Sequence, residues 1–215
     1  MLKIAIYNNK GGVGKTTSVI NIAYALHKLG KQVLVIDCDM QKNSYMFFLS
    51  EIEDRILPSK YENIKHTTYT DFTQLSEDEL KDFEYILFDL PPVLSDDVLE
   101  IIKKADKVFV PLMLRQFELA GLNNLVSKCN NLGGIFVTMY DNEDEELLNQ
   151  FKDGLKDRLM YSCIHFSKAV IKSQRAMLPV GEYLLQKGTP KVFRKSWQAY
   201  DEYYALTNEI IERTK

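Results

Sequence analysis

A glycine-rich loop that begins ten residues into the chain has the composition of a phosphate-binding site. It reads Lys-Gly-Gly-Val-Gly-Lys-Thr-Thr over residues 10–17. Glycines let the backbone wrap closely around phosphate oxygens and point its N–H groups at them. Lys15 is expected to neutralise the β- and γ-phosphates, the Thr16 hydroxyl to bind Mg²⁺, and Thr17 to reach the α-phosphate. The predicted nucleotide contacts are Lys10, Gly11, Gly12, Val13, Gly14, Lys15, Thr16 and Thr17.

Three aspartates further along the chain have the positions of magnesium ligands. Asp37 and Asp39 follow the apolar run 33–36, and Asp89 follows the run 85–88. Ligands of open α/β sheets bind at the carboxyl ends of the strands, where a carboxylate holds Mg²⁺ directly or through water. A single aspartate after a strand is often only a cap, but three of them beside a phosphate loop favour a site for Mg²⁺ and ATP. The predicted metal ligands are Thr16, Asp39 and Asp89.

The elements that must position these residues alternate between short apolar runs and helical patterns. The apolar runs do not alternate in polarity, as expected for strands buried on both faces of a parallel sheet. They cover residues 2–7, 33–36, 85–88, 108–110 and 135–139, and helices are predicted over 16–29, 97–104, 118–130 and 143–158. This rhythm predicts an α/β fold with a doubly wound, mostly parallel sheet flanked by helices. The glycine-rich loop lies between the first strand and the first helix, as in a P-loop NTPase.

The rest of the chain fits a single ATPase domain over residues 1–215, because 215 residues is an ordinary length for one domain. Residues 50–82 are polar and predict only a short helix over 77–83, with Ser76 as its cap. The last segment predicts one long helix at about 192–213, whose aromatic residues would pack it onto the body of the domain.

Cysteine content and hydropathy argue against several classes of protein. The three cysteines, Cys38, Cys129 and Cys163, form no CxxC pair or Cys/His cluster, which disfavours a zinc or iron–sulfur site and suits a reducing cytosol. No apolar run approaches the roughly 18 residues that would span a bilayer. The first residues lead directly into a strand and have no signal-peptide pattern. We therefore expect a cytoplasmic protein.

Five motifs follow one another along the chain. They are KGGVGKTT at 10–17, DCDMQKN at 37–43, FDLPP at 88–92, ADKVFVP at 105–111 and VTMYD at 137–141. In type and order they resemble the motifs of the ParA/MinD family of ATPases, whose phosphate loop is a deviant Walker A motif. The resemblance extends from the first strand to about Pro179 and so covers most of the chain.

The resemblance implies roles for individual residues. Lys10 resembles the signature lysine of the family, which reaches across an ATP-sandwich dimer to the partner's phosphates. Asp39 would position or activate the attacking water, and Asp37 would support the site around the lysines and Mg²⁺. Because phosphoryl transfer to water depends mainly on positioning and charge stabilisation, a slow ATPase with a lysine supplied by the dimer is expected. The residues implied in catalysis are Lys10, Lys15, Asp37 and Asp39.

Two positions depart from the family pattern. Met40 stands where the family has a proline, and Leu90 stands where it has a threonine whose hydroxyl lies near the γ-phosphate. Both changes leave the charged groups intact. We therefore expect them to alter the rate and the coupling between sites more than the activity itself.

The distribution of charge favours contact with DNA. Between His165 and Lys195 there are seven basic residues and one acid, although the whole chain has a net charge of −3. Basic helix faces displace counterions from duplex phosphates without base contacts. A solvated helix surface is the alternative, but ParA-like proteins bind DNA through this part of the chain. The predicted DNA-binding residues are Lys168, Lys172, Arg175, Lys191, Arg194 and Lys195.

The resemblance is strongest to small plasmid-type ParA proteins, since no helix-turn-helix precedes the first strand. It implies a nucleoid-associated bacterial ATPase that closes into a homodimer on ATP and binds DNA non-specifically. A ParB- or ParG-like centromere-binding protein would stimulate hydrolysis, and the cargo would be a plasmid or another DNA element. A MinD-like ATPase acting on a membrane or protein cargo is disfavoured, because anionic lipid would repel the acidic tail 201–212. An ATP-gated binding module with little turnover is the other alternative.

Overall fold

A central eight-stranded sheet organises the computed structural model, which describes all residues except 40–43, 45–54, 117–121, 123–125, 128 and 189–193. The strand order is β3-β4-β2-β5-β1-β6-β7-β8, and every neighbouring pair is parallel except β3 and β4. The predicted doubly wound sheet is thereby confirmed. The strands are β1 Leu2–Ile6, β2 Val33–Asp37, β3 Leu57–Pro58, β4 Ile64–Thr68, β5 Tyr85–Asp89, β6 Lys107–Leu112, β7 Leu132–Tyr140 and β8 Leu159–His165.

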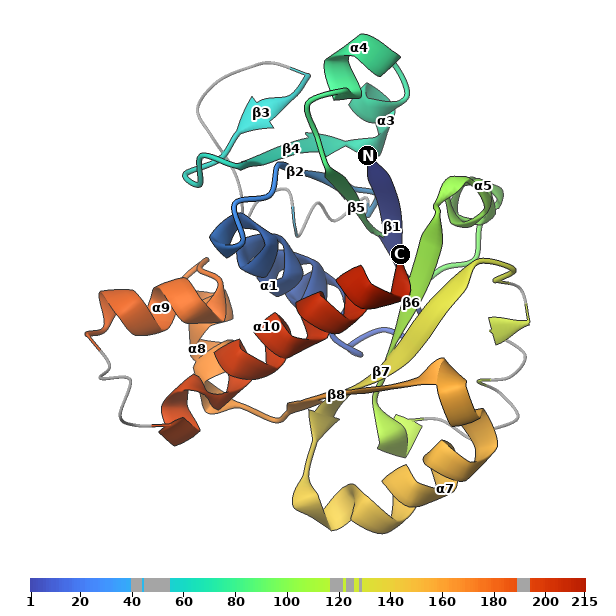
Figure 1. The fold of residues 1–215 in the computed structure, drawn as a ribbon, viewed down its shortest axis with the longest axis vertical. Coiled ribbons are helices and arrows are strands. Elements are labelled where there is room, and N and C mark those ends of the chain that lie inside the picture. The colour runs from blue at the N-terminus through green and yellow to red at the C-terminus, as the bar shows by residue number, and fades with distance from the viewer. Residues whose placement is uncertain (40–43, 45–54, 117–121, 123–125, 128, 189–193) are drawn as a thin grey trace.

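Helices cover both faces of this sheet. One layer is formed by α1 and α10, with α8 and α9 at one end of α10, and α5 and α7 lie on the other side of the sheet (Figure 1). The helices are α1 Lys15–Lys28, α3 Tyr69–Phe72, α4 Glu77–Leu80, α5 Asp96–Lys104, α7 Glu145–Leu155, α8 Lys168–Arg175, α9 Val180–Gln186 and α10 Arg194–Arg213. Short 3₁₀ turns occupy Leu114–Gln116, Asn142–Asp144 and Lys156–Arg158.

Successive residues of the central strands face two separate apolar cores. In β1, Ile4 and Ile6 pack into the core beneath α1 and α10, whereas Ala5 packs into the core beneath α5 and α7. All three side chains are fully buried. Because the central strands are buried on both faces of the sheet, their sequences are unbroken apolar runs. This pattern allowed the strands to be predicted from the sequence.

The ends of α1 and α4 follow from local chemistry. Gly30 has φ +74° just after α1, a left-handed conformation that glycine adopts without strain. Ser76 caps α4, because its hydroxyl accepts the Glu79 amide while the Glu79 carboxylate accepts the Ser76 amide. The predicted helix over 143–158 is shorter than expected, since only α7 is α-helical and 3₁₀ turns flank it. The predicted helix 118–130 lies mostly outside the described residues.

The edge of the sheet at β8 is covered by carboxylates from α10. Glu209 accepts hydrogen bonds from the backbone N–H groups of Tyr161 and Ser162, at 2.9 and 2.8 Å. Two turns earlier on the same helix, Glu202 accepts the N–H of His165 at 2.9 Å. An edge strand otherwise offers such donors to any other strand that approaches it. The last helix therefore completes the sheet with side chains in place of a ninth strand.

Candidate nucleotide-binding site

The strand order brings the phosphate loop and the two strand-end aspartates together. β5 lies between β1 and β2, and the register pairs Asp89 with both Ile6 and Asp37. Strands that are far apart in the chain therefore end side by side, directly below the loop that follows β1. Asp37 and Asp89, which the sequence predicted to lie in one site beside the phosphate loop, end neighbouring strands in register.

The loop has the backbone geometry that phosphate binding requires. Gly12 has φ +74° and Gly14 has φ +84°, both in the left-handed region where a side chain would be strained. Gly14 is also the N-cap of α1, so the N–H groups of the first helical turn point into the loop. Backbone N–H groups and the positive end of the helix dipole together form an anion site.

Two polar side chains from outside the loop hold it in place. Asn8 donates from Nδ2 to the Pro111 carbonyl at 2.7 Å, and its Oδ1 accepts the Lys10 amide at 3.0 Å. Thr138, near the end of β7, donates from Oγ1 to the Val13 carbonyl at 3.0 Å. Sequence reasoning assigned no role to Asn8 or Thr138, because their partners lie 103 and 125 residues away. The appearance of Thr138 in a motif is the one signal that could have pointed to it.

The side chain of Lys15 is held within the loop by the backbone carbonyl of Lys10. Its ammonium donates to the Lys10 carbonyl at 3.0 Å, and the residue is only 8% exposed. Burial lowers the pKa of Lys15, while the charges of Asp89 and Asp39 oppose that effect. The ammonium is thus positioned between the loop and the strand-end carboxylates before any ligand arrives.

Asp89 is a buried carboxylate that the described side chains leave incompletely satisfied. It is 1% exposed, and neither oxygen accepts a well-formed hydrogen bond from a described residue. Burial, together with the charge of Asp37, raises its pKa to about 7, against the lowering effect of the Thr16 and Ser44 hydroxyls and of Lys15. A divalent cation would supply the missing positive charge, so the residues present fit Mg²⁺.

The other predicted site residues lie around this centre. Asp39 is half-buried, and its amide donates to Asp37 Oδ1 at 2.9 Å. Lys10 is exposed at the surface of the loop. Met40, and with it the remainder of the 37–43 motif, lies outside the described residues. Leu90 is 1% exposed and packs into the core beneath α5 and α7, so the position that departs from the family pattern is apolar and enclosed.

Thr17 connects the nucleotide loop to α8. Its hydroxyl accepts a hydrogen bond from Gln174 Nε2, and its carbonyl accepts one from Asn21 Nδ2 at 2.8 Å. Asn21 also accepts the Val180 amide, at the start of α9. A hollow of about 120 Å³ adjoins this contact, lined by Gly14, Thr138, Met139, Phe166 and Gln174 among others. The segment containing α8 and α9 is therefore fixed to the first helix of the site.

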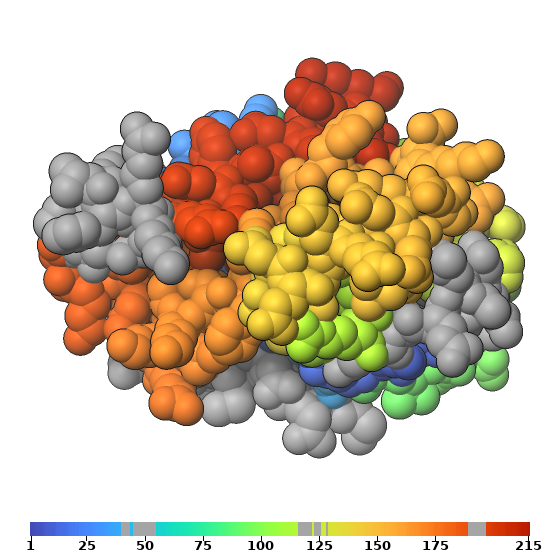
Figure 2. Space-filling model, turned by 90° about the horizontal axis from the view of Figure 1, so that it is seen from below, coloured from blue at the N-terminus to red at the C-terminus, as the bar shows by residue number. Residues whose placement is uncertain are grey.

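The predicted DNA-binding residues are only partly described. Lys168, Lys172 and Arg175 are exposed on α8, which lies at the surface beside α9 (orange in Figure 2). Lys191 lies outside the described residues. Arg194 and Lys195 begin α10, but their side chains are not described. Among the described residues, no helix is long and apolar enough to cross a membrane.

Sequence comparison places this site among known ATPases. Residues 1–78 match the family model of an AAA domain. The chain is 25% identical to the chromosome partitioning protein ParA of Myxococcus xanthus, over 89% of this chain and 90% of that protein. It is 31% identical to the chromosome-partitioning ATPase Soj of Thermus thermophilus, over 65% of this chain and 70% of that protein. The chain belongs to the ParA/MinD family of ATPases.

The fold of this ParA/MinD ATPase is shared with solved structures. The septum site-determining protein MinD of Pyrococcus horikoshii, in complex with Mg-ADP, is similar with a TM-score of 0.71 and 16% identity. The similarity covers 100% of this chain and 98% of that one. The loop 10–17 follows β1 at the carboxyl edge of this shared sheet, where a phosphate-binding loop is expected.

Proposed function

We propose that this chain is a partition ATPase that binds Mg-ATP at the loop 10–17 and moves a plasmid or another DNA cargo. The relatives that it resembles include proteins named for chromosome partitioning. The observation that carries the proposal is the pairing of left-handed Gly12 and Gly14 with the buried, incompletely satisfied carboxylate of Asp89. The loop supplies donors for phosphate, and the carboxylate supplies an acceptor for a cation.

We assign each residue of the site a separate role in ATP hydrolysis. The loop amides and Lys15 would bind and orient the phosphates, while Thr16 and Asp89 would hold Mg²⁺ with Asp39 close by. Bound Mg²⁺ would supply Lewis-acid neutralisation of the charge that develops on the phosphates. Asp39 would position the attacking water. The carboxylate of Asp37 holds Asp39 in place, because it accepts a hydrogen bond from the backbone amide of Asp39. Turnover would be slow without a partner, because phosphoryl transfer to water depends on positioning and charge stabilisation that a partner would complete.

Lys10 would act across a homodimer. Its backbone is fixed at both ends, since its amide donates to Asn8 and its carbonyl accepts from Lys15, while the residue itself is exposed. An exposed lysine on a fixed loop beside the phosphate site suits a contact with nucleotide on a second copy of the chain. ATP binding would then close the dimer.

The closed dimer would bind DNA without sequence preference. Lys168, Lys172 and Arg175 lie at helical spacing on exposed α8, and α8 contacts the nucleotide loop helix through Gln174 and Thr17. Lys191, Arg194 and Lys195 are proposed to extend this contact. A ParB- or ParG-like centromere-binding protein would stimulate hydrolysis and so release the DNA.

The test is DNA binding by the purified protein, measured with random-sequence duplex at moderate salt and with ATP, ADP or no nucleotide. Binding should require ATP and should be lost in Lys10→Ala and in the double variant Lys172→Ala/Arg175→Ala. Lys103→Ala is the matched control, because Lys103 is an exposed lysine on α5. Nucleotide binding that leaves DNA untouched in every state would defeat the DNA part of the proposal. ATP turnover that stays absent with DNA and a partner would defeat the enzymatic part.

A further inference from the structure

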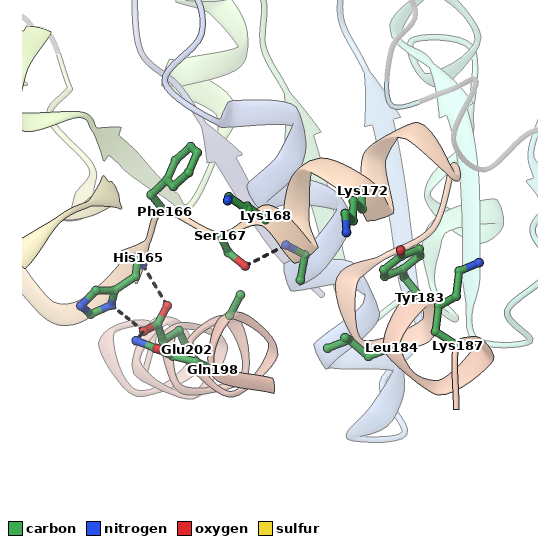
Figure 3. A pocket seen from close by; sticks show the side chains of 12 residues that line it. His165, Phe166, Ser167, Lys168, Lys172, Tyr183, Leu184, Lys187, Gln198 and Glu202 are labelled. Carbon is green, nitrogen blue, oxygen red and sulfur yellow. Dashed lines mark hydrogen bonds and ion pairs between the residues drawn. The ribbon is translucent and has the colours of Figure 1, made fainter. Parts of the chain in front are cut away.

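A hollow of about 650 Å³ is lined by residues of α8, α9 and α10 and of the segment that precedes α8 (Figure 3). Its volume is in the range of about 300–1,000 Å³ that is usual for sites that bind ligands. The described residues that line it are His165, Phe166, Ser167, Lys168, Ala169, Lys172, Tyr183, Leu184, Lys187, Gln198, Ala199 and Glu202.

The charges that face the hollow are predominantly positive. Lys168 and Lys172 come from α8 and Lys187 from the end of α9, and none of the three forms an ion pair with a described residue. Glu202 is the one carboxylate among the described lining residues. Its oxygens are already engaged, by His165 Nδ1 at 2.6 Å, by the His165 amide, and by Gln198 Nε2 at 2.8 Å. Three lysines and a carboxylate that is already engaged therefore line the hollow.

Apolar side chains line the hollow between these lysines. Leu184 and Ala199 are almost fully buried and still contribute to its wall. Tyr183 lies beside Lys187, whose ammonium is 5.9 Å from the centre of the tyrosine ring. Phe166 is 54% exposed, which is unusual for so large an apolar side chain. A ligand that fits must bring both apolar groups and negative charge.

The wall that α9 contributes is closely packed against the body of the protein. A Cβ atom at Gly181 would lie 2.5 Å from the Tyr200 ring and 2.9 Å from the Tyr24 ring, so only glycine allows this approach. Tyr24 also donates a hydrogen bond to Glu182 at 3.0 Å. The hollow is thus formed before a ligand binds, which lowers the entropy cost of binding.

We propose that this hollow binds an acidic segment of a partner protein, with apolar side chains against Phe166 and Tyr183 and carboxylates against the three lysines. The inference rests on the proposed function, since it assigns a binding place to the partner of the partition ATPase. A DNA backbone would satisfy the lysines but has no apolar side chains to cover Phe166 and the partly exposed Tyr183. An amphipathic acidic helix satisfies both parts of the site.

The position of the hollow gives the partner a means of releasing DNA. Lys168 and Lys172 line the hollow and also belong to the proposed DNA-binding set, so one side chain cannot serve both ligands at once. Lys187 lines the hollow but is not in that set, and Arg175 is in that set but does not line the hollow. These two residues allow the two ligands to be tested separately.

The experiment uses the full chain and a fluorescein-labelled synthetic peptide of about 20 residues, long enough to form a helix, with leucine on one face and glutamate on the other. Its counterpart carries glutamine in place of glutamate. Fluorescence anisotropy would measure binding of each peptide, and DNA binding would be measured on the same protein. The variants are Lys187→Glu and Arg175→Glu, with Lys103→Glu as the control.

We expect Lys187→Glu to weaken binding of the acidic peptide about tenfold or more, because one attraction becomes a repulsion. Arg175→Glu should lower DNA binding and leave peptide binding within twofold, and unlabelled acidic peptide should displace DNA.

The proposal is overturned if the acidic peptide binds no better than its glutamine counterpart, or if the Lys187→Glu variant binds the acidic peptide as tightly as wild type does. It is equally overturned if Lys187→Glu affects DNA alone, which would make the hollow a nucleic-acid contact. DNA binding that persists in either case leaves the proposed function standing.

Discussion

Thr138 shows how a single hydroxyl from a distant strand can fix a binding loop. Thr138 is 3% exposed, and its hydroxyl donates a hydrogen bond that joins the end of β7 to the Val13 carbonyl inside the loop. Val13 is itself fully buried, so its carbonyl has little access to water. The loop is therefore held in a binding conformation by a contact that touches no nucleotide.

At the residue scale, we predict that Thr138→Val weakens ATP binding severalfold and lowers the free energy of unfolding by about 1–3 kcal/mol. Valine preserves the shape but leaves the Val13 carbonyl without its donor, which is the costly way to break a hydrogen bond. Nucleotide titration and urea unfolding would measure the two effects. Thr138→Ser, which retains the hydroxyl, should behave almost as wild type. Equal losses in both variants would show that packing of the methyl group matters instead.

The sequence predicted those residues of the site whose side chains or backbone would contact the nucleotide or the cation directly. Glycines, lysines and a threonine in a fixed order identify a phosphate loop, and an aspartate after an apolar strand identifies a candidate cation ligand. Asn8, Thr138 and Gln174 were missed because each acts on a partner that is far away in the chain. Their residue types are common, and only the folded sheet shows what they contact.

At the scale of elements, the contact between β8 and α10 depends on two glutamates. Burial raises the pKa of Glu209, but its hydrogen bonds with Ser162 and Tyr161 and the charge of Arg213 outweigh that effect, so the net shift is downward. Arg213 lies one turn further on and pairs with Glu209 at 3.1 Å. The carboxylate thus links a strand edge to the end of the last helix.

We predict that Glu209→Gln lowers the free energy of unfolding by about 1–3 kcal/mol at neutral pH. A carboxyl whose pKa is lowered by folding stabilises the protein above its unfolded pKa of about 4.3 and loses that contribution as pH falls through the folded pKa. The difference between wild type and variant should therefore shrink below about pH 4.3. Chemical unfolding over a range of pH would measure it. Glu212→Gln, at an exposed position on the same helix, should show no such difference.

The strands that the sequence pattern missed lie toward the sides of the sheet. β4 reads Ile-Lys-His-Thr-Thr, and its His66 and Thr67 are almost fully buried although their side chains are polar. β8 is an edge strand in which Tyr161 is 94% exposed. Neither has the unbroken apolar run by which β1, β2 and β5 were found. Their strand conformation comes from pairing with a neighbour, which sequence periodicity does not record.

For the whole molecule, the separation of charge sets how association with DNA should depend on salt. The chain as a whole is acidic, with a net charge of −3, while basic residues collect between His165 and Lys195. The proposed attraction to DNA would therefore come mainly from this basic segment, and the acidic remainder of the chain would repel the duplex. The uneven distribution of charge would by itself orient the protein on DNA, with the basic segment toward the duplex.

We predict that the affinity of the ATP-bound protein for duplex DNA falls linearly on a double-logarithmic plot against salt concentration. Replacement of Lys168, Lys172 or Arg175 by alanine should each reduce the magnitude of the slope by about 1, because one phosphate contact is removed. Titrations at several salt concentrations would give the slopes, and Lys103→Ala should leave the slope unchanged. A slope that all three replacements leave intact would place the DNA contact elsewhere.

The position of α10 has a consequence for the biosynthesis of the protein. α1 carries the first part of the nucleotide site, yet its outer face packs against Trp197, Tyr203 and Leu206 of α10. At synthesis rates of about 5–20 residues per second, roughly 10–40 s separate the emergence of these two helices. During that time the nascent chain has an uncovered apolar helix and an open strand edge, both of which a chaperone can bind. A chain cut short within the last helix would thus leave the apolar outer face of α1 exposed to solvent.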